Sequence, residues 1–188
     1  MSKVPLTRFV MKLSIKLLCL TATALVFSSC GSTSSLQTPA ANGIEQARYS
    51  KVLVKDFSAT VMDQKQQVKV AQSYFPDRIA QELRKTGRFN SVTRSGSADA
   101  KTLVINGVIT RYSEGNAAMR MLVGMGAGSS YFDSQVMLQN NRKKLLGTVK
   151  VDKNSWALGG GIAAGQTPTT YMDGAAKKIA KESTAFAK

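Results

Sequence analysis

The chain has 188 residues, of which 26 are Lys or Arg and 11 are Asp or Glu, so its formal net charge is +15, and 43% of its side chains are hydrophobic. This length and composition are typical of one globular domain. With no His and two Cys, the sequence excludes Ser-His-Asp and Cys-His nucleophile pairs, His metal sites and a four-thiolate zinc site. We therefore expect a protein that is not an enzyme and that holds no metal and no cofactor.

The amino terminus has the layout of a secretory signal peptide. Its basic residues are Lys3, Arg8, Lys12 and Lys16. An apolar run over residues 17–27 follows, and at about 11 residues it is shorter than the roughly 20 that a membrane span needs. We expect it to be cleaved, which takes four bases from 26 and leaves 22 against 11 acids, a charge near +11. Met11 begins a compact signal of its own, so translation could start at Met1 or Met11.

Residues 26–30, VFSSC, resemble the lipobox of bacterial lipoproteins, although Phe27 stands where Leu is usual. The resemblance implies that Cys30 becomes the first mature residue and carries acyl chains that hold the protein in a membrane. Gly31, rather than Asp, follows the Cys, and by resemblance to sorted lipoproteins this favours the outer membrane, facing the periplasm. The alternative is an ordinary signal peptidase site near Ser28 to Ser29, which leaves a soluble periplasmic protein with one free thiol.

We expect three regions, namely a signal peptide over residues 1–29, an acylated Cys with a flexible tether over residues 30–43, and a periplasmic domain over residues 44–188. The tether sequence GSTSSLQTPAANG has no charge and little apolar surface to bury. Such a chain has a typical end-to-end distance of about 20 Å. The domain of about 145 residues is long enough to fold without help.

The first half of the domain predicts a strand, a helix and a second strand. KVLVKDF, residues 51–57, is a short apolar run that favours a buried strand. Apolar residues then recur every fourth position, and Pro76 is best tolerated near a helix start, so we expect a helix from Pro76 to Lys85 that stops at Gly87. Residues 89–94 form a candidate strand.

The second half predicts three strands and a closing helix. Residues 101–112, 131–139 and 145–151 alternate apolar and polar side chains. Residues 140–143, NNRK, are typical of a hairpin turn in which Asn accepts positive φ, so the last two strands should be antiparallel neighbours. The end of the chain has helical spacing, and Thr170 with Asp173 resembles a capping box. The order β-α-β-β-β-β-α predicts an α/β two-layer domain, with a mixed, partly antiparallel sheet of about five strands and two helices on one face.

The most unusual segment lies between two of these strands. Its distinctive residues are Gly115, Asn116, Arg120, Gly124, Gly126, Gly128 and Ser129. In the spacing G-N-x-x-x-R-x-x-x-G-x-G-x-G-S they resemble the hallmark of a bacterial lipoprotein family, domain of unknown function 4410, with a looser likeness from Lys51 to about Lys181. The resemblance implies a fold and an envelope location, and no established activity.

Three interpretations of this segment stay open. A phosphate cradle would use the glycine backbone N–H groups, but the segment precedes a strand instead of a helix and lacks the Lys-Ser/Thr pair of a P-loop. A second interpretation is a connection whose positive φ angles admit only Gly. The third is an interaction surface, formed by the apolar residues Met119, Met121, Leu122, Val123 and Met125. A second glycine stretch over residues 156–168 leads to the further hypothesis of self-association into a homo-oligomer.

For function, we expect a non-catalytic outer-membrane lipoprotein that presents a basic domain to an envelope protein or polymer that is still to be identified. Export separates it from nucleic acid, so its charge does not indicate a nucleic-acid partner. An alternative is a module for a small anionic ligand, or an enzyme, that uses Arg120, Asp56 and the glycine loop. A third hypothesis is a structural link between membrane and cell wall. Asp56 and Glu114 are candidate acids, although capping or ion pairing is the simpler role for each.

Overall fold

The structure is a computed structural model that describes residues 32–39, 48–61, 65–123, 126–155 and 165–188. The chain divides into two compact units, residues 1–30 and 31–188, and every described residue belongs to the second. The expected signal peptide and Cys30 lie outside the described residues. Within the described ranges, no helix has both the length and the hydrophobicity that crossing a bilayer requires.

In the described part of the chain, seven strands form one mixed sheet. They are β1 (Ser32–Thr33), β2 (Lys51–Val54), β3 (Ser58–Ala59), β4 (Ser91–Thr93), β5 (Thr102–Ser113), β6 (Tyr131–Gln139) and β7 (Leu145–Asn154). The order across the sheet is β1-β7-β6-β5-β2-β4, and β3 pairs with the second half of β5. Pairs on the β2 side are parallel, whereas β5, β6, β7 and β1 are antiparallel neighbours, as expected for the last two long strands.

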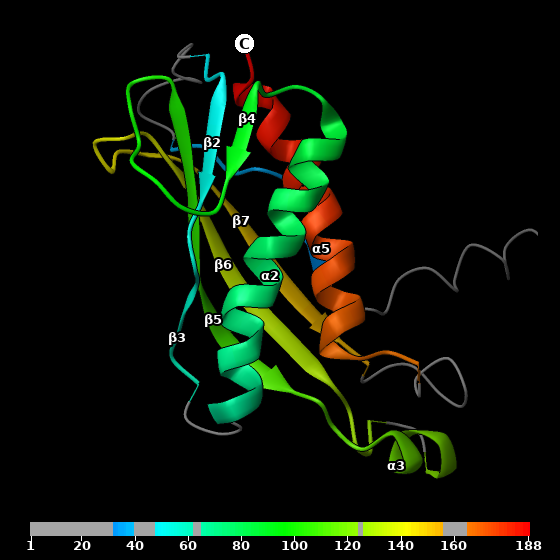
Figure 1. Cartoon of the computed structure of the whole chain (residues 1–188). Helices are drawn as coiled ribbons and strands as arrows, with labels where there is room; N and C mark the ends of the chain where they lie inside the picture. Colours follow the sequence, from blue (N-terminus) through cyan, green and yellow to red (C-terminus); the bar gives the residue numbers. More distant parts are fainter. Residues whose placement is uncertain (1–31, 40–47, 62–64, 124–125, 156–164) are drawn as a thin grey trace, which may run out of the picture. The chain divides into compact units, whose positions relative to one another are not determined.

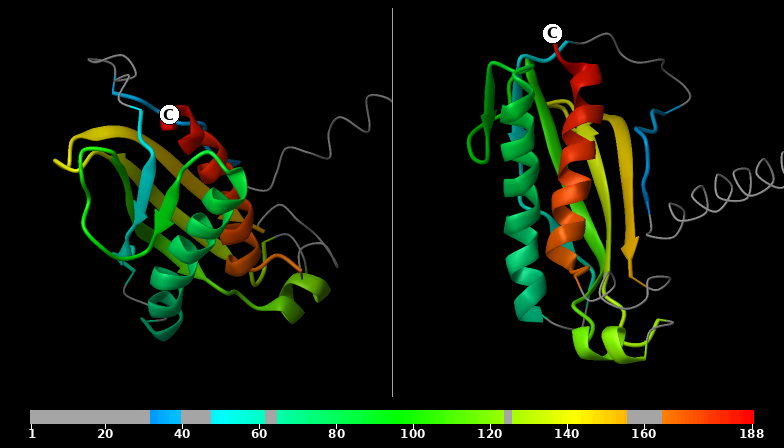
Figure 2. Two further views of the ribbon diagram at one scale, coloured as in Figure 1. Left: turned by 45° about the horizontal axis from the view of Figure 1, so that its top comes forward. Right: turned by 90° about the vertical axis from the view of Figure 1, so that its right-hand side faces the viewer.

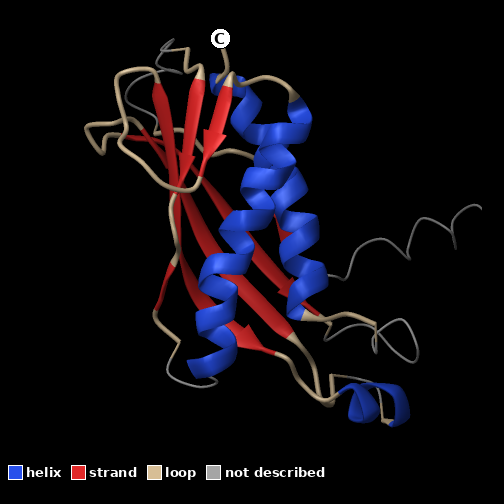
Figure 3. Ribbon diagram, viewed as in Figure 1, coloured by secondary structure: helices blue, strands red, loops and turns tan. Residues whose placement is uncertain are grey.

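Two long helices, α2 (Lys65–Thr86) and α5 (Pro168–Ser183), lie side by side on one face of the sheet (Figures 1 and 2). A short 3₁₀ helix, η2 (Thr184–Phe186), ends the chain. Between the layers, Phe75 of α2 makes edge-to-face contacts with Phe57 and Phe132, at ring separations of 5.3 and 5.0 Å. The predicted α/β class with a mixed sheet is confirmed (Figure 3).

Helix α2 begins eleven residues before the predicted start, and Pro76 lies inside it. A proline in a helix leaves the carbonyl four residues earlier without its usual donor. Here that carbonyl belongs to Gln72, and it accepts a hydrogen bond from the backbone N–H of Phe57 at 3.0 Å. The Gln72 amide donates in return to the Phe57 carbonyl. The loop after β2 therefore supplies the missing donor, and the helix continues to the predicted stop at Gly87, where φ is +62°.

Helix α5 presents the predicted apolar face to the core. Its buried residues include Met172, Ala175, Ala176, Ile179, Ala180 and Ser183. The predicted capping box was wrong by three residues, because Thr167 is the N-cap and Pro168 occupies the first turn. The Thr167 hydroxyl accepts from the backbone N–H of Thr170, and the Thr170 hydroxyl accepts from that of Thr167. Asp173 instead pairs with Arg78 of α2 at 2.6 Å.

The predicted hairpin between β6 and β7 is confirmed, with one correction in its turn. The residue with positive φ is Lys143, at +63°, and not an Asn. Asn140 acts through its side chain, whose oxygen accepts hydrogen bonds from the backbone N–H groups of Arg142 and Lys144. The basic side chains at this hairpin tip are exposed.

Residues 32–39 differ from the flexible tether that we expected. Ser32 and Thr33 pair with the end of β7, and Gln37 exchanges two backbone hydrogen bonds with Thr148. Helix α5 adds two contacts, since Lys178 donates to the Thr33 carbonyl and Glu182 accepts from the Leu36 N–H. The segment therefore begins with the short edge strand β1 and continues along β7, held by backbone hydrogen bonds that its polar composition did not reveal.

Candidate functional site

The predicted glycine segment forms a loop, residues 114–130, which we call the α3 loop, between β5 and β6. It contains the short helix α3 (Ala117–Leu122), which projects beyond the end of the sheet (Figure 1). Asn116 is the N-cap in an extended conformation, and its side-chain oxygen accepts from the Met119 N–H at 3.0 Å. Asn116 thus starts the helix, which explains one position of the sequence motif.

Arg120 lies inside the α3 loop and is 3% exposed. Its Nη1 atom donates to the carbonyl oxygens of Glu114, at 3.0 Å, and Gly128, at 2.7 Å. These two residues stand on opposite sides of the loop, so one guanidinium joins the chain that leaves β5 to the chain that enters β6. Hydrogen bonds that involve a charged donor are among the stronger ones in proteins. Arg120 therefore holds the loop closed from within.

Gly115 and Gly128 allow the two sides of the loop to approach each other. Both have positive φ, +66° and +67°. A Cβ on Gly115 would meet Nη1 of Arg120 at 2.6 Å, and one on Gly128 would meet the Asn116 carbonyl oxygen at 2.5 Å. The Asn116 N–H in turn donates to the Gly128 carbonyl at 2.8 Å. Only glycine fits both positions, in agreement with the interpretation of a connection that requires positive φ.

The rest of the motif is also used within the loop. Gly126 has φ +89°, and its carbonyl accepts from the Ser129 hydroxyl at 2.7 Å and from the Ser129 N–H at 3.2 Å. Gly124 lies outside the described residues. The motif N–H groups of Asn116 and Ser129 therefore point to carbonyl oxygens of the loop, an arrangement that does not support a phosphate cradle.

The outer side of α3 is apolar. Met119, Met121, Leu122 and Val123, which we call the α3 apolar face, are 43%, 58%, 81% and 60% exposed. These four residues belong to the predicted interaction surface, whereas Met125 lies outside the described residues. Arg120 is the buried residue of this helix. The polarity of α3 is thus the reverse of that of a helix packed on a domain core.

A polar cluster that sequence reasoning missed fastens the base of the loop to α5. Ser130 is fully buried, and its Oγ donates to the Gln166 carbonyl at 2.7 Å and lies 3.2 Å from the Tyr171 hydroxyl. The Ser155 hydroxyl accepts from the Ser130 N–H at 3.0 Å. These residues are far apart in sequence and no local pattern marks them. The cluster connects the α3 loop to the rest of the domain.

Charged groups lie on the open face of the sheet beside the loop. The Arg111 guanidinium stacks 3.6 Å from the centre of the Tyr131 ring. Asp133 lies opposite Asp152 in the register of β6 and β7, and its Oδ1 atom is buried without a hydrogen-bond partner. Burial first, and then the charge of Asp152, raise the pKa of Asp133, against the effect of Arg111.

The two candidate acids have separate partners. Asp56 forms an ion pair with Arg94, which also pairs with Asp77. The Glu114 carboxylate accepts from the Tyr112 hydroxyl at 3.3 Å, and burial together with the Glu114 charge raises the pKa of Tyr112 to about 12. Neither the Asp56–Arg94 pair nor the Glu114–Tyr112 pair brings Asp56 to Arg120. In the described ranges, no group of three potential metal ligands occurs.

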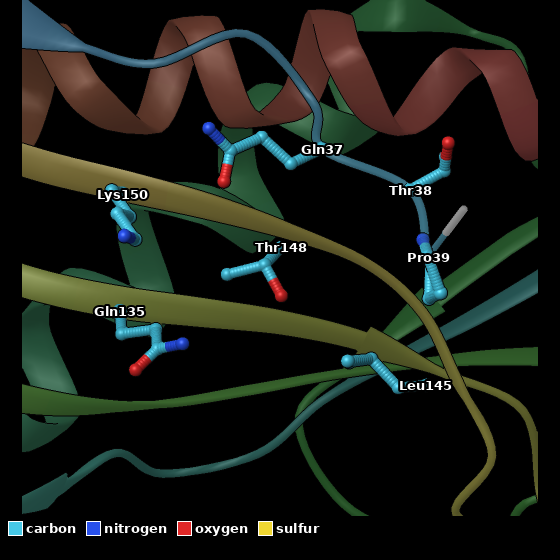
Figure 4. Close-up of a pocket in the computed structure, with 7 residues that line it drawn as sticks. All are labelled: Gln37, Thr38, Pro39, Gln135, Leu145, Thr148 and Lys150. Atoms are coloured by element: carbon cyan, nitrogen blue, oxygen red, sulfur yellow. The ribbon is translucent and has the colours of Figure 1, made fainter.

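A shallow groove of about 270 Å³ lies elsewhere, between residues 37–39 and the strands β6 and β7 (Figure 4). It is lined by Gln37, Thr38, Pro39, Gln135, Leu145, Thr148 and Lys150. Gln135 and Lys150 alternate along their strands with the core residues Val136 and Val149, so the groove is on the sheet face opposite the helices. Lys150 is the one ionisable group among these seven residues.

Comparison with known proteins identifies a family and a fold. The family described as domain of unknown function (DUF4410) matches residues 49–159. A PelC dodecamer from Paraburkholderia phytofirmans has 14% sequence identity and a TM-score of 0.53, over 84% of this chain and 99% of that chain. Another structure of PelC from the same organism gives 15% identity and a TM-score of 0.47, over 79% and 96%.

A neuraminyllactose-binding hemagglutinin homolog from Helicobacter pylori has 11% identity and a TM-score of 0.38, over 81% of this chain and 91% of that chain. No curated protein matches the sequence. At these identities, the likeness to PelC with a TM-score of 0.53 shows a shared fold and nothing more.

Proposed function

The chain belongs to the DUF4410 family, and we propose that it is a non-catalytic lipoprotein that is anchored through Cys30 in the outer membrane and presents a basic α/β domain to an envelope protein or polymer. The observation that carries the proposal is the organisation of the α3 loop. Arg120, Asn116 and Ser129 make hydrogen bonds inside the loop, while the α3 apolar face is exposed. Exposed apolar patches of this kind are typical of interaction sites.

The anchor is supported by sequence alone, through the resemblance of residues 26–30 to a lipobox. It is tested by metabolic labelling with palmitate in cells that express the full chain, followed by separation of inner and outer membranes. We expect label in the wild-type protein in the outer-membrane fraction, and no label in Cys30→Ser. An unlabelled wild-type protein in the soluble periplasmic fraction would contradict the anchor.

The interaction role is tested by site-specific crosslinking in the intact envelope. A photo-crosslinking residue at Leu122, on the α3 apolar face, should yield a defined product, whereas one at Val70 serves as control because this residue is similarly apolar and 60% exposed but lies on α2. If the partner is a second copy of this chain, native mass spectrometry should show a homo-oligomer, the state named for the PelC structure. Absence of any product specific to Leu122 would count against an interaction surface at α3.

A link to the cell wall is a second version of the same role, and it follows from the net charge near +11. The exposed bases Arg142, Lys143 and Lys144 lie together at the β6–β7 hairpin tip. Attraction between these bases and the carboxylates of peptidoglycan should be weak and sensitive to salt. Sedimentation with purified peptidoglycan at low and high salt tests it, and binding that salt leaves unchanged would argue against a charge-based link.

The alternative of a small-ligand or enzyme module built on Arg120 has less support. The guanidinium is buried, and its Nη1 atom already donates to two carbonyl oxygens. An anionic ligand would have to displace those contacts and open the loop. Isothermal titration with inorganic phosphate or acetate would show binding if this alternative were correct.

A further inference from the structure

Helix α3 has its charge inside and its apolar side chains outside. Among residues 117–123, AAMRMLV, the one charged side chain is Arg120, and it points into the loop. The remaining six residues are exposed and carry neither charge nor a polar side chain. This composition leaves the end of the domain with a small surface that water solvates poorly.

The α3 apolar face is fixed in its exposed position. The hydrogen bonds of Arg120 and the close contact between Gly115 and Gly128 hold the two sides of the loop together. The buried hydroxyl of Ser130 then ties the loop base to the Gln166 carbonyl. Leu122 and Val123 are therefore kept away from the core by the same contacts that fold the loop. The α3 apolar face is therefore available for contact with an apolar environment outside the domain.

The position of β1 indicates which apolar environment is near. Ser32 pairs with Asp152 and Thr33 with Val151, so the amino-terminal end of β1 points toward the carboxyl end of β7. That end of β7 pairs, through Asn154, with Tyr131, which begins β6 directly after the α3 loop. Figure 2 shows β1 alongside β7 and α3 beyond the end of the sheet.

The chain between Ser32 and residue 30 is short. Two Cα steps of 3.80 Å span at most about 7.6 Å, whatever conformation they adopt. A lipid on Cys30 would therefore leave the domain close to the end of the sheet from which α3 projects. Contacts of Thr33 with Lys178 and of Leu36 with Glu182 hold β1 and the residues after it in place, so the start of β1 at Ser32 is fixed relative to the sheet.

We propose that the α3 apolar face inserts into the interfacial region of the bilayer that holds the Cys30 acyl chains. This inference rests on the proposed function, because the anchor brings α3 to the membrane at high effective concentration. Met, Leu and Val side chains without a charged neighbour on the surface match the boundary between headgroups and acyl chains, where such faces lie about 5–10 Å deep. The domain then has two membrane contacts, and these fix its orientation.

The test uses an environment-sensitive nitrobenzoxadiazole label on the full-length acylated protein, purified from membranes and reconstituted in phosphatidylethanolamine–phosphatidylglycerol vesicles. The label is placed on Leu122→Cys, a position 81% exposed, where the substitution removes no core contact. The control is Asn141→Cys, an exposed residue at the hairpin beyond the other end of β6. The nine residues of β6 separate the two positions by about 30 Å.

We expect fluorescence at position 122 to increase at least twofold on reconstitution, to be quenched by spin-labelled lipids and to be protected from aqueous iodide. Fluorescence at position 141 should change little on reconstitution, should not be quenched by spin-labelled lipids and should be quenched by aqueous iodide. Iodide quenching at 122 equal to that at 141 would overturn the proposal. Protection from iodide without quenching by spin-labelled lipids would also overturn it, since the face would then contact protein, such as a second copy.

Flotation of the same vesicles separates this inference from the function on which it rests. If the protein fails to float and carries no palmitate, the anchor is absent and both proposals fail. If it floats but position 122 remains in water, the anchor stands and only insertion of α3 is refuted. Hydrogen exchange of the Asn116 and Ser129 amides in the labelled variant, compared with wild type, verifies that the loop is folded.

Discussion

Replacing Arg120 by Met should open the α3 loop while the sheet stays folded. The substitution keeps an unbranched side chain of similar length but removes the donor that Glu114 and Gly128 share. Each hydrogen bond to a charged group contributes about 1.5–3 kcal/mol. The Gly128 carbonyl retains the Asn116 N–H, and removal of the guanidinium ends its own desolvation cost, so both effects reduce the total. We expect a net local loss of about 3 kcal/mol.

The loss should be confined to the loop, because α3 lies beyond the strands and domains open in separate cooperative regions. Native-state hydrogen exchange at the Asn116 and Ser129 amides measures it. A loss of about 3 kcal/mol corresponds to exchange about 100-fold faster, while amides of β5 and β6 near Ile105 and Leu138 should keep wild-type rates. Arg120→Lys, which can still donate from a cation, should show a smaller change.

Two outcomes would refute this reasoning. Unchanged exchange at Asn116 in Arg120→Met would mean that the guanidinium does not hold the loop closed. Equal acceleration across the β5–β6 pairing would mean that Arg120 supports the whole domain rather than its end. In either case the fixed exposure of the α3 apolar face would lose its structural explanation.

Other consequences can be measured on the same protein. Phe75→Ala should lower the free energy of unfolding by about 3–5 kcal/mol in urea titrations, because Phe75 is fully buried between two rings. Asp133→Asn should raise the free energy of unfolding at pH 7, because the raised pKa of Asp133 means that folding disfavours its charged form. This gain in stability should shrink as the pH falls through the pKa of Asp133, since the wild-type carboxyl then binds a proton. A gain that grows in acid would contradict the assignment. Gly147→Val should push Leu36 away, because a Cβ there would lie 2.5 Å from it, and the Ser34 and Gln37 amides should exchange at least tenfold faster, whereas wild-type rates would show that the segment is held without this contact.

Regular patterns predicted the regular part of the fold. The hairpin of β6 and β7 could be predicted because β6 alternates along its nine residues and β7 alternates through its middle, and α5 because its apolar residues recur at helical spacing. The full length of α2 could not, because the donor that replaces Pro76 is the backbone N–H of Phe57, which a local pattern does not reveal. Residues 32–39 were missed for a related reason, since Leu36 is the one large apolar residue among them.

The sequence indicated which residues form the candidate site, but not how their side chains are arranged. The motif marked Gly115, Asn116, Arg120 and Gly128, and the structure brings all four together. The direction in which Arg120 points could not be predicted, because a charged residue in a short helix is usually solvated. A hint was available in the sequence AAMRMLV, where a single base stands among apolar residues that exceed what one helical face accommodates.

The pairing of β1 with β7 also has a mechanical consequence. A force applied to the amino-terminal end of β1 along the strand axis would act across its backbone hydrogen bonds, because bonds between strands run perpendicular to that axis. Such a force would therefore load the backbone hydrogen bonds of Ser32, Ser34 and Gln37 to β7 together, in shear, instead of breaking them one after another. The load would be shared between β7 and α5, which contacts the same segment through Lys178 and Glu182, so that the segment resists separation from the domain as a unit.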